Sequence, residues 1–93
     1  LLTFAGTGVR AQISLTGTVH SQTENEPLPG AYVYPQNSPS LLTTTDAAGT
    51  FSLELPAPDT LIVSFLGYTE LRRYVATSGQ LDLRLTTAAD LQE

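Results

Sequence analysis

The sequence predicts an all-β fold, a seven-stranded Greek-key β-sandwich whose two sheets enclose one apolar core. Short runs in which apolar and polar residues alternate are typical of strands with one buried face. Turn-forming residues separate these runs roughly every eight to twelve positions, a spacing typical of sandwich domains. No stretch of useful length repeats with the period of a helix. At 93 residues the chain is long enough for one domain and no more.

Each expected strand ends at residues that turn the chain or interrupt pairing. The polar stretch 21–27 follows the first strand, and Pro35 and Pro39 bracket a loop because proline cannot donate a hydrogen bond to a neighbouring strand. Asp46 can accept backbone N–H bonds and Gly49 can take a positive φ, so the turn between them is expected to be a hairpin. The expected strands are 13–20, 31–34, 41–45, 50–55, 60–66, 68–76 and 81–86.

The core is expected where the apolar rows of these strands meet. The stretch 60–66 has almost no polar interruption, which is typical of a central strand covered on both faces. The other strands alternate and bury one face each. The inward rows expected from this pattern are Ile13, Leu15, Phe51, Leu53, Val63, Phe65, Leu83 and Leu85.

Composition and charge exclude several kinds of partner. The net charge is −5, and the only basic residues are four arginines, of which Arg72 and Arg73 alone are adjacent. Neither nucleic acid nor an anionic membrane surface is expected as a partner, because both bind clusters of basic residues. With no cysteine, the chain can form neither a disulfide nor a thiolate metal site. Strand pairing and apolar packing must therefore stabilise the fold.

The sequence predicts no catalytic, cofactor-binding or metal site, and the chain is expected not to be an enzyme. His20 is the only histidine, and zinc would need further histidine or cysteine ligands. The carboxylates lack the dense spacing of a calcium loop, and none lies in an apolar run that would suit it to glycoside hydrolysis. The acidic residues that loops could bring together are Glu24, Glu26, Asp46, Asp59 and Asp82.

The tyrosines are the best candidates for a contact surface. Tyr32 and Tyr34 stand two apart in one expected strand, so they share a face and could stack on sugar rings or line a partner interface. The alternative is that they only cover the flank of the sandwich, as Tyr68 and Tyr74 also could.

The first eleven residues differ from the rest. They are apolar or small, contain no acid, and place Val9 and Ala11 two apart, as small residues stand before a signal-peptidase site. This layout favours the tail of a secretory signal cleaved after Ala11, and an N-terminal strand or a disordered arm is the alternative. The expected organisation is a signal remnant at 1–11, a sandwich at 12–86 and a linker to a downstream region at 87–93.

Four short motifs follow one another with a specific spacing. A strand with Gly17-Thr18-Val19 precedes the turn Pro-Leu-Pro-Gly-Ala at 27–31, the Thr-Asp-x-x-Gly-x-Phe segment at 45–51 and an apolar strand closing in Gly67-Tyr68. In order and spacing these motifs resemble those of the carboxypeptidase-regulatory-like domain, and the resemblance covers about residues 13–85. It implies a transthyretin-like (prealbumin-like) sandwich.

The resemblance implies structural roles for the motif residues. Gly17 would let a strand or side chain approach closely, while Gly30 and Gly49 would hold turn conformations. Gly67 would relieve crowding before the next residue, and Phe51 would fill the core together with the apolar central strand. The structural motif residues are Gly17, Val19, Pro29, Gly30, Asp46, Gly49, Phe51, Gly67 and Tyr68.

The resemblance also implies a place in the cell. Such domains lie directly behind the signal peptide in SusC-like TonB-dependent outer-membrane receptors of Bacteroidetes. This implies a non-catalytic periplasmic domain, itself outside the membrane, in a Gram-negative receptor for nutrients such as glycans. It would act as a spacer or as a module that contacts a protein of the envelope, either TonB or a receptor-associated lipoprotein. The alternatives are a carbohydrate-binding or adhesive module that uses Tyr32 and Tyr34, and an accessory domain of a secreted metallocarboxypeptidase.

Overall fold

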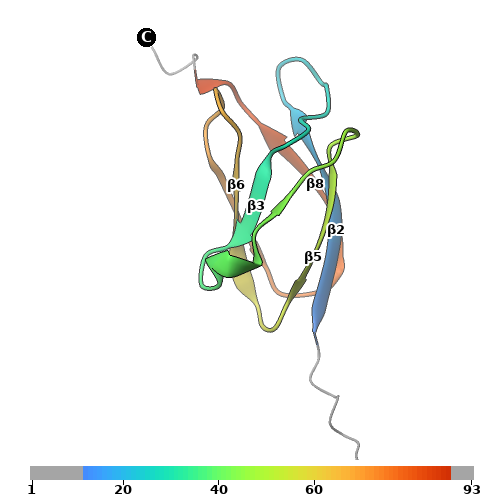
Figure 1. Ribbon diagram of the computed structural model, residues 1–93, viewed down its shortest axis with the longest axis vertical. Coiled ribbons are helices and arrows are strands. Elements are labelled where there is room, and N and C mark those ends of the chain that lie inside the picture. Colours follow the sequence, from blue (N-terminus) through green and yellow to red (C-terminus); the bar gives the residue numbers. More distant parts are fainter. Residues whose placement is uncertain (1–11, 89–93) are drawn as a thin grey trace, which may run out of the picture.

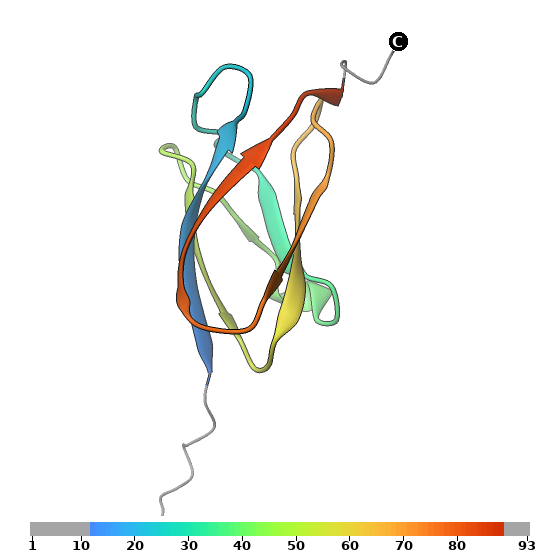
Figure 2. The same ribbon diagram turned by 180° about the vertical axis from the view of Figure 1, so that it is seen from behind.

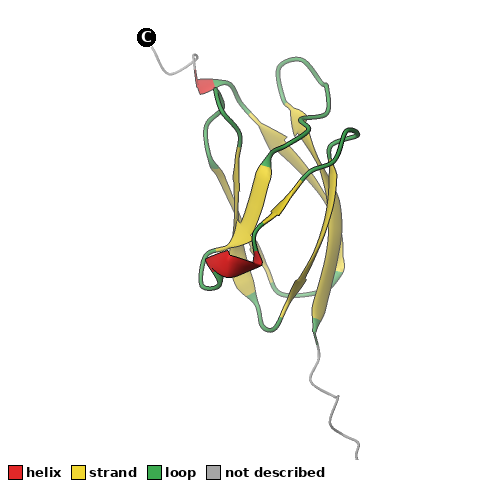
Figure 3. Cartoon of the chain, viewed as in Figure 1, coloured by secondary structure: helices red, strands yellow, loops and turns green. Residues whose placement is uncertain are grey.

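A computed structural model describes residues 12–88 (Figure 1). These residues form seven strands in two sheets, together with the short 3-10 turn η2 (Pro39–Leu41) (Figure 3). The all-β sandwich expected from the alternating pattern is thereby confirmed. The strands are β2 (Ile13–Ser21), β3 (Tyr32–Pro35), β4 (Thr43–Thr44), β5 (Thr50–Leu55), β6 (Asp59–Ser64), β7 (Leu71–Val75) and β8 (Gly79–Leu85).

The strands are ordered β5-β2-β8 in one sheet and β4-β3-β6-β7 in the other. Four of the six connections between consecutive strands cross from sheet to sheet, giving the Greek-key arrangement seen from both sides in Figures 1 and 2. The first and last described strands, β2 and β8, are parallel neighbours, with Leu15 opposite Gly79 and Ser21 opposite Leu85. All other strand pairs are antiparallel.

The core lies between the sheets, where the inward rows of both meet. In β2 and β5 every second residue is buried, and in β8 Leu83 and Leu85 are buried while Leu81 is partly buried, in agreement with the period of the sequence. Of the expected inward rows, Phe65 alone is only partly buried, and it packs against the edge of the core. The buried core residues also include Val19, Leu28, Ala31, Val33, Leu55, Leu61 and Val75.

The central strand β6 is apolar on both faces, as expected, but it is shorter than the apolar stretch in the sequence. Leu61 and Val63 point into the core, whereas Ile62 is buried on the outer face, opposite Tyr34 and Arg72 in the neighbouring strands. The strand stops at Ser64. Leu66 was expected inside it, yet its side chain is 95% exposed, which corrects the strand boundary.

Two other boundaries differ from expectation because local hydrogen bonds compete with the sheet. The strand expected at 41–45 is reduced to β4, since the backbone N–H of Leu42 donates to the carbonyl of Pro39 and closes the turn η2. The strand expected at 68–76 begins only at Leu71. Before it, Tyr68 forms an isolated bridge with Thr87.

The turn from Asp46 to Gly49 is present, but it does not join two paired strands. Its backbone is closed by a bond from the N–H of Gly49 to the carbonyl of Asp46, at 2.8 Å. However, β4 belongs to one sheet and β5 to the other. The hairpin prediction was therefore wrong: the turn is a corner that carries the chain from sheet to sheet, so that Phe51 lies opposite Gly17 of β2.

The three turns that contain motif residues lie at one end of the sandwich (Figures 1 and 2). The chain enters β2 at the opposite end, and β8 delivers it to the end where the motif turns lie. The expected signal remnant at 1–11, with its cleavage after Ala11, lies outside the described residues. Of the expected linker at 87–93, the structure describes Thr87 and Ala88, and the N–H of Ala88 donates to the carbonyl of Gly67. No helix within 12–88 has the length and apolar character needed to cross a membrane.

Candidate functional site

Three of the four motifs meet at a single backbone junction around Val19. The N–H of Val19 donates to the carbonyl of Gly49 at 2.8 Å, and its carbonyl accepts from the N–H of Leu28 at 2.9 Å. The end of β2 thus binds both the turn at 27–31 and the turn at 46–49, which lie next to each other: a Cβ at Gly49 would lie 2.9 Å from the Cβ of Pro27. We call this set of contacts the motif junction.

The buried residue Thr45 connects the two turns through hydrogen bonds. The hydroxyl of Thr45 donates to the carbonyl of Leu28 at 2.6 Å and accepts from the N–H of Ala31 at 2.8 Å. Its own N–H donates to the carbonyl of Ala31, and its carbonyl accepts from the N–H of Gly30, which has φ +83°. Sequence reasoning missed this role: it placed Thr45 at the end of a strand and at the start of the motif at 45–51, but gave its hydroxyl no partner. The signal that could have found it is its position directly before the Asp46 turn.

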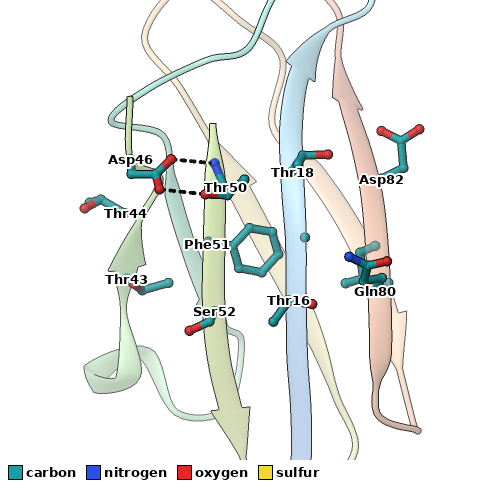
Figure 4. Close-up of a pocket in the computed structure, with 12 residues that line it drawn as sticks. Thr16, Thr18, Thr43, Thr44, Asp46, Thr50, Phe51, Ser52, Gln80 and Asp82 are labelled. Atoms are coloured by element: carbon teal, nitrogen blue, oxygen red, sulfur yellow. Dashed lines mark hydrogen bonds between the residues drawn. The ribbon is translucent and has the colours of Figure 1, made fainter. Parts of the chain in front are cut away.

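Asp46 uses its carboxylate within its own turn. Oδ1 accepts from the backbone N–H groups of Ala48 and Thr50, and Oδ2 accepts from the Thr50 hydroxyl at 2.6 Å (Figure 4). The hydroxyl bond, followed by the backbone bonds, holds the pKa of Asp46 below its ordinary value. This carboxylate therefore caps a turn and is poorly suited to bind a cation or to take up a proton.

Two motif glycines stand where a side chain would collide with neighbouring atoms. A Cβ at Gly17 would lie 2.7 Å from the carbonyl oxygen of Leu81 and 2.8 Å from the ring of Phe51. At Gly49, which has φ +78°, it would lie 2.9 Å from the carbonyl oxygen of Val19. Both glycines let backbone approach backbone at the junction or beside it.

The fourth motif forms a separate contact near the exit of the chain. Gly67 has φ +90°, and no atom of the described residues lies within 4 Å of where its Cβ would be, so it serves the backbone turn and does not relieve crowding as was expected. The N–H of Tyr68 donates to the carbonyl of Phe65. The rings of Phe65 and Tyr68 are tilted, with centroids 5.6 Å apart. The N–H of Thr69 in turn donates to the carbonyl of Thr86, so this segment ties the end of β8 to the other sheet.

The histidine and the carboxylates do not gather into a site. Nδ1 of His20 lies 3.8 Å from a carboxylate oxygen of Asp82, whose other oxygen lies 3.4 Å from Arg84. Asp59 is buried, and its oxygens accept from the side chain of Asn37 at 3.0 Å and from backbone N–H groups. No group of three or more metal-ligating His, Cys, Asp or Glu residues exists within the described part of the chain.

The outer face of the β5-β2-β8 sheet carries a hollow with a volume of about 800 Å³ (Figure 4). Hydroxyl groups dominate its lining, and its two carboxylates, Asp46 and Asp82, are both already bonded or paired within the protein. We call it the hydroxyl face. Its polar side chains are Thr16, Thr18, Thr43, Thr44, Asp46, Thr50, Ser52, Gln80 and Asp82.

The outer face of the other sheet carries a group of aromatic and apolar side chains around β3. Tyr32 and Tyr34 both point outward from β3, as their spacing predicted, and Tyr32 is 51% exposed. Two hollows share Tyr32 and Ser64, and we call them together the tyrosine groove. The first is lined by Tyr32, Tyr34, Pro39, Leu42 and Ser64, and the second by Gly30, Tyr32, Ser64, Phe65 and Leu66. Tyr68 packs on the core instead, and Tyr74 is exposed on β7 outside the groove.

Comparison with known proteins identifies relatives of the whole sandwich. Residues 15–93 match the family model described as the CarboxypepD_reg-like domain. Among curated proteins, the TonB-dependent receptor P26 of Formosa agariphila is 36% identical over 90 residues. The match covers 97% of this chain but only 9% of that receptor.

Solved structures share the fold at low sequence identity. The 3-chlorocatechol 1,2-dioxygenase of Rhodococcus opacus 1CP matches with a TM-score of 0.61 and 14% identity, covering 84% of this chain and 60% of that one. The C-terminal domain of the shaft pilin SpaA of Lactobacillus rhamnosus GG matches with a TM-score of 0.59 and 12% identity, covering 84% and 99%. These likenesses show that the sandwich is a shared architecture and carry no information about activity.

Proposed function

The chain belongs to the CarboxypepD_reg-like domain family, and we propose that it is a non-catalytic domain of a TonB-dependent outer-membrane receptor. The observation that carries this proposal is the match over nearly the whole chain to a receptor about ten times as long. A domain of this kind lies in the periplasm, outside the membrane, and serves the uptake of a nutrient. Glycans are the nutrient class that we propose first.

The contacts of the described residues support a role without catalysis. The carboxylates of Asp46 and Asp59 are engaged in hydrogen bonds that hold turns and loops. Nδ1 of His20 lies 3.8 Å from a carboxylate oxygen of Asp82 and has no hydrogen-bond partner within residues 12–88. Among the described residues, no serine or threonine forms a hydrogen bond with His20 that would activate it as a nucleophile. The polar groups of this domain thus stabilise its shape.

The path of the chain supports a domain inserted end to end between the segments that precede and follow it in the receptor. The described chain enters at one end of the sandwich and leaves at the other (Figure 1). The 9-residue strand β2 alone spans about 30 Å at the usual rise per residue. Such a domain holds its two flanking segments apart, and it presents both sheet faces to the periplasm. We propose that it also contacts a protein of the envelope, TonB or a receptor-associated lipoprotein.

A replacement experiment in the parent receptor tests the proposal and separates its two parts. Residues 12–88 are deleted, or are replaced by the SpaA C-terminal domain, which has a similar size and fold but 12% identity. We expect deletion to slow growth on the transported nutrient. If the replacement restores growth, the domain acts as a spacer; if it does not, the domain makes a specific contact.

Two results would contradict the proposal. One is normal nutrient uptake after deletion, with the receptor present at its normal level. The other is turnover of any ester, amide or glycoside substrate by the purified 93-residue chain. The reading frame beyond Glu93 gives an independent check, because a zinc-peptidase domain there would indicate an accessory domain of a secreted metallocarboxypeptidase instead.

A further inference from the structure

The tyrosine groove combines unusual exposure with an absence of charge. Tyr32 is 51% exposed, Leu42 48% and Leu66 95%, although each is a large apolar side chain. None of the residues that line the two hollows is charged. Scattered exposed apolar residues are ordinary, but side chains gathered around shared hollows are typical of a surface that a partner covers.

The shape of the groove favours an elongated ligand. The groove begins at Gly30, just before β3, and follows that strand from Tyr32 to Tyr34. It lies beside Ser64, at the end of β6. Tyr32 lines both hollows, whereas Leu42 lines only the first and Leu66 only the second. In an extended peptide, side chains two positions apart point the same way and stand about 7 Å apart, enough to pass on either side of an aromatic ring.

The chemistry of the lining favours a peptide over a sugar. A neutral glycan needs several polar side chains to bond its hydroxyl groups, and here the side-chain hydrogen-bonding groups are three hydroxyls, those of Tyr32, Tyr34 and Ser64. The remaining lining side chains are those of proline, leucine and phenylalanine. The hydroxyl face on the other sheet has many more polar side chains and would suit a neutral sugar better than the groove does. In the groove, only stacking on the ring of Tyr32 would favour a sugar.

The negative net charge of the chain favours basic peptides over acidic ones as ligands. With a net charge of −5, the domain attracts basic segments and repels acidic ones. In the sheet that carries the groove, the basic side chains are those of Arg72 and Arg73 in β7. Arg72 is held by Glu70 at 2.8 Å and by Gln36 at 3.2 Å, and Arg73 lies opposite Leu61, in the row that faces the other sheet and not the groove. Neither arginine is therefore placed to recruit an acidic partner to the groove.

We propose that the tyrosine groove binds an extended segment of a partner protein that carries two apolar side chains at positions i and i+2 and basic residues beside them. The proposal rests on the proposed function, because it supplies the protein contact of the receptor domain. The two apolar side chains enter the hollows on either side of Tyr32, and the flanking basic residues lie in the negative potential of the domain.

Three synthetic peptides and two variants of the 93-residue chain test this site, with binding followed by NMR titration. We expect Lys-Leu-Thr-Leu-Lys to bind, Glu-Leu-Thr-Leu-Glu to bind several-fold more weakly, and Lys-Ser-Thr-Ser-Lys not to bind. Tyr32→Ala should weaken binding of the first peptide about tenfold, which is typical of an aromatic residue central to a contact. The matched control is Tyr74→Ala, which removes an exposed tyrosine outside the groove and should leave binding unchanged.

The proposal is overturned if the first peptide fails to bind, if the serine peptide binds equally well, or if Tyr32→Ala has no effect. It is also overturned if a neutral glucan oligosaccharide binds in a manner that requires Tyr32 while the peptides do not. Such results refute only the proposal that the groove binds a peptide. The proposed receptor function fails separately, when deletion of residues 12–88 leaves nutrient uptake unchanged.

Discussion

The motif junction and the tyrosine groove differ in how completely their groups are engaged. At the junction, both backbone groups of Val19 and the hydroxyl of Thr45 are paired, and Gly49 leaves no space for a side chain. In the groove, Tyr32 and Leu66 expose half or more of their side chains. The residues of the motif junction thus build the fold, whereas the surface available to a partner consists mainly of residues outside the motifs. Membership of the family therefore predicts the sandwich better than it predicts what the sandwich binds.

The largest expected effect is the loss of close approach at the junction. Gly49→Ala combines a strained positive φ with a Cβ 2.9 Å from the carbonyl oxygen of Val19, and should lower the free energy of unfolding by about 3 kcal/mol. Gly30→Ala is the matched control, because its φ is +83° but nothing lies near the added atom. It should cost only about 1 kcal/mol. Urea unfolding of both variants measures the difference, and equal losses would show that crowding at the junction is unimportant.

The next effect is the loss of the buried hydroxyl. Thr45→Val keeps the shape of the side chain but leaves the carbonyl of Leu28 and the N–H of Ala31 without this partner, so stability should fall by about 2 kcal/mol. Thr45→Ser keeps both bonds and should lose less than about 1 kcal/mol. Thermal unfolding followed by circular dichroism compares the two. A valine variant as stable as the serine variant would show that the Thr45 hydroxyl does not hold the junction.

A smaller, pH-dependent effect is expected at the Asp46 turn. The pKa of Asp46 is lower in the folded than in the unfolded chain, so near its ordinary value of 3.8 the unfolded chain binds more protons and stability rises with pH. This contribution is fully present above 3.8 and disappears as the pH falls through the lower folded-state pKa. Urea unfolding at a series of pH values should show less acid destabilisation in Asp46→Asn than in the parent chain.

Thr50→Val sharpens this test because it removes the hydroxyl bond, which is the largest cause of the lowered pKa, while the backbone bonds remain. Its acid sensitivity should lie between those of the parent chain and Asp46→Asn. Identical pH profiles for all three proteins would contradict the assigned cause.

The smallest expected effect on stability lies in the groove. Tyr32→Ala should change the free energy of unfolding by no more than about 0.5 kcal/mol, because half of the side chain is already in water. The adjacent residue is a natural control: Val33 is fully buried in the same strand, and Val33→Ala should cost about 2 kcal/mol. If both variants unfolded at the same urea concentration, the distinction between an engaged and an available surface would be lost.

The elements that could be read from the sequence are those governed by local periodicity. Alternation in 13–20, 50–55 and 81–86 predicted which side chains face the core, and the same period placed Tyr32 and Tyr34 on one outer face. Turn chemistry at Asp46 and Gly49 predicted a turn. It could not predict that the flanking strands belong to different sheets, because that depends on partners distant in the chain.

Sequence reasoning could predict the two tyrosines of the groove but not the leucines that complete it. Leu42 and Leu66 reach the groove from loops whose course depends on the turn η2 and on the positive φ of Gly67. Both leucines were expected within strands, where alternation alone would decide which face of a sheet each side chain occupies. In the structure both lie in loops, and the course of each loop decides where the side chain points. The role of Thr45 was hidden for the same reason, since its partners lie 14 and 17 residues away.

The most direct test of the central claim is an NMR titration of the 93-residue chain with Lys-Leu-Thr-Leu-Lys that records which backbone amides shift. We expect shifts along β3 and at Ser64 to Leu66, with the amides of Val19, Thr45 and Gly49 unmoved. Shifts confined to the hydroxyl face or to the motif junction would contradict the claim.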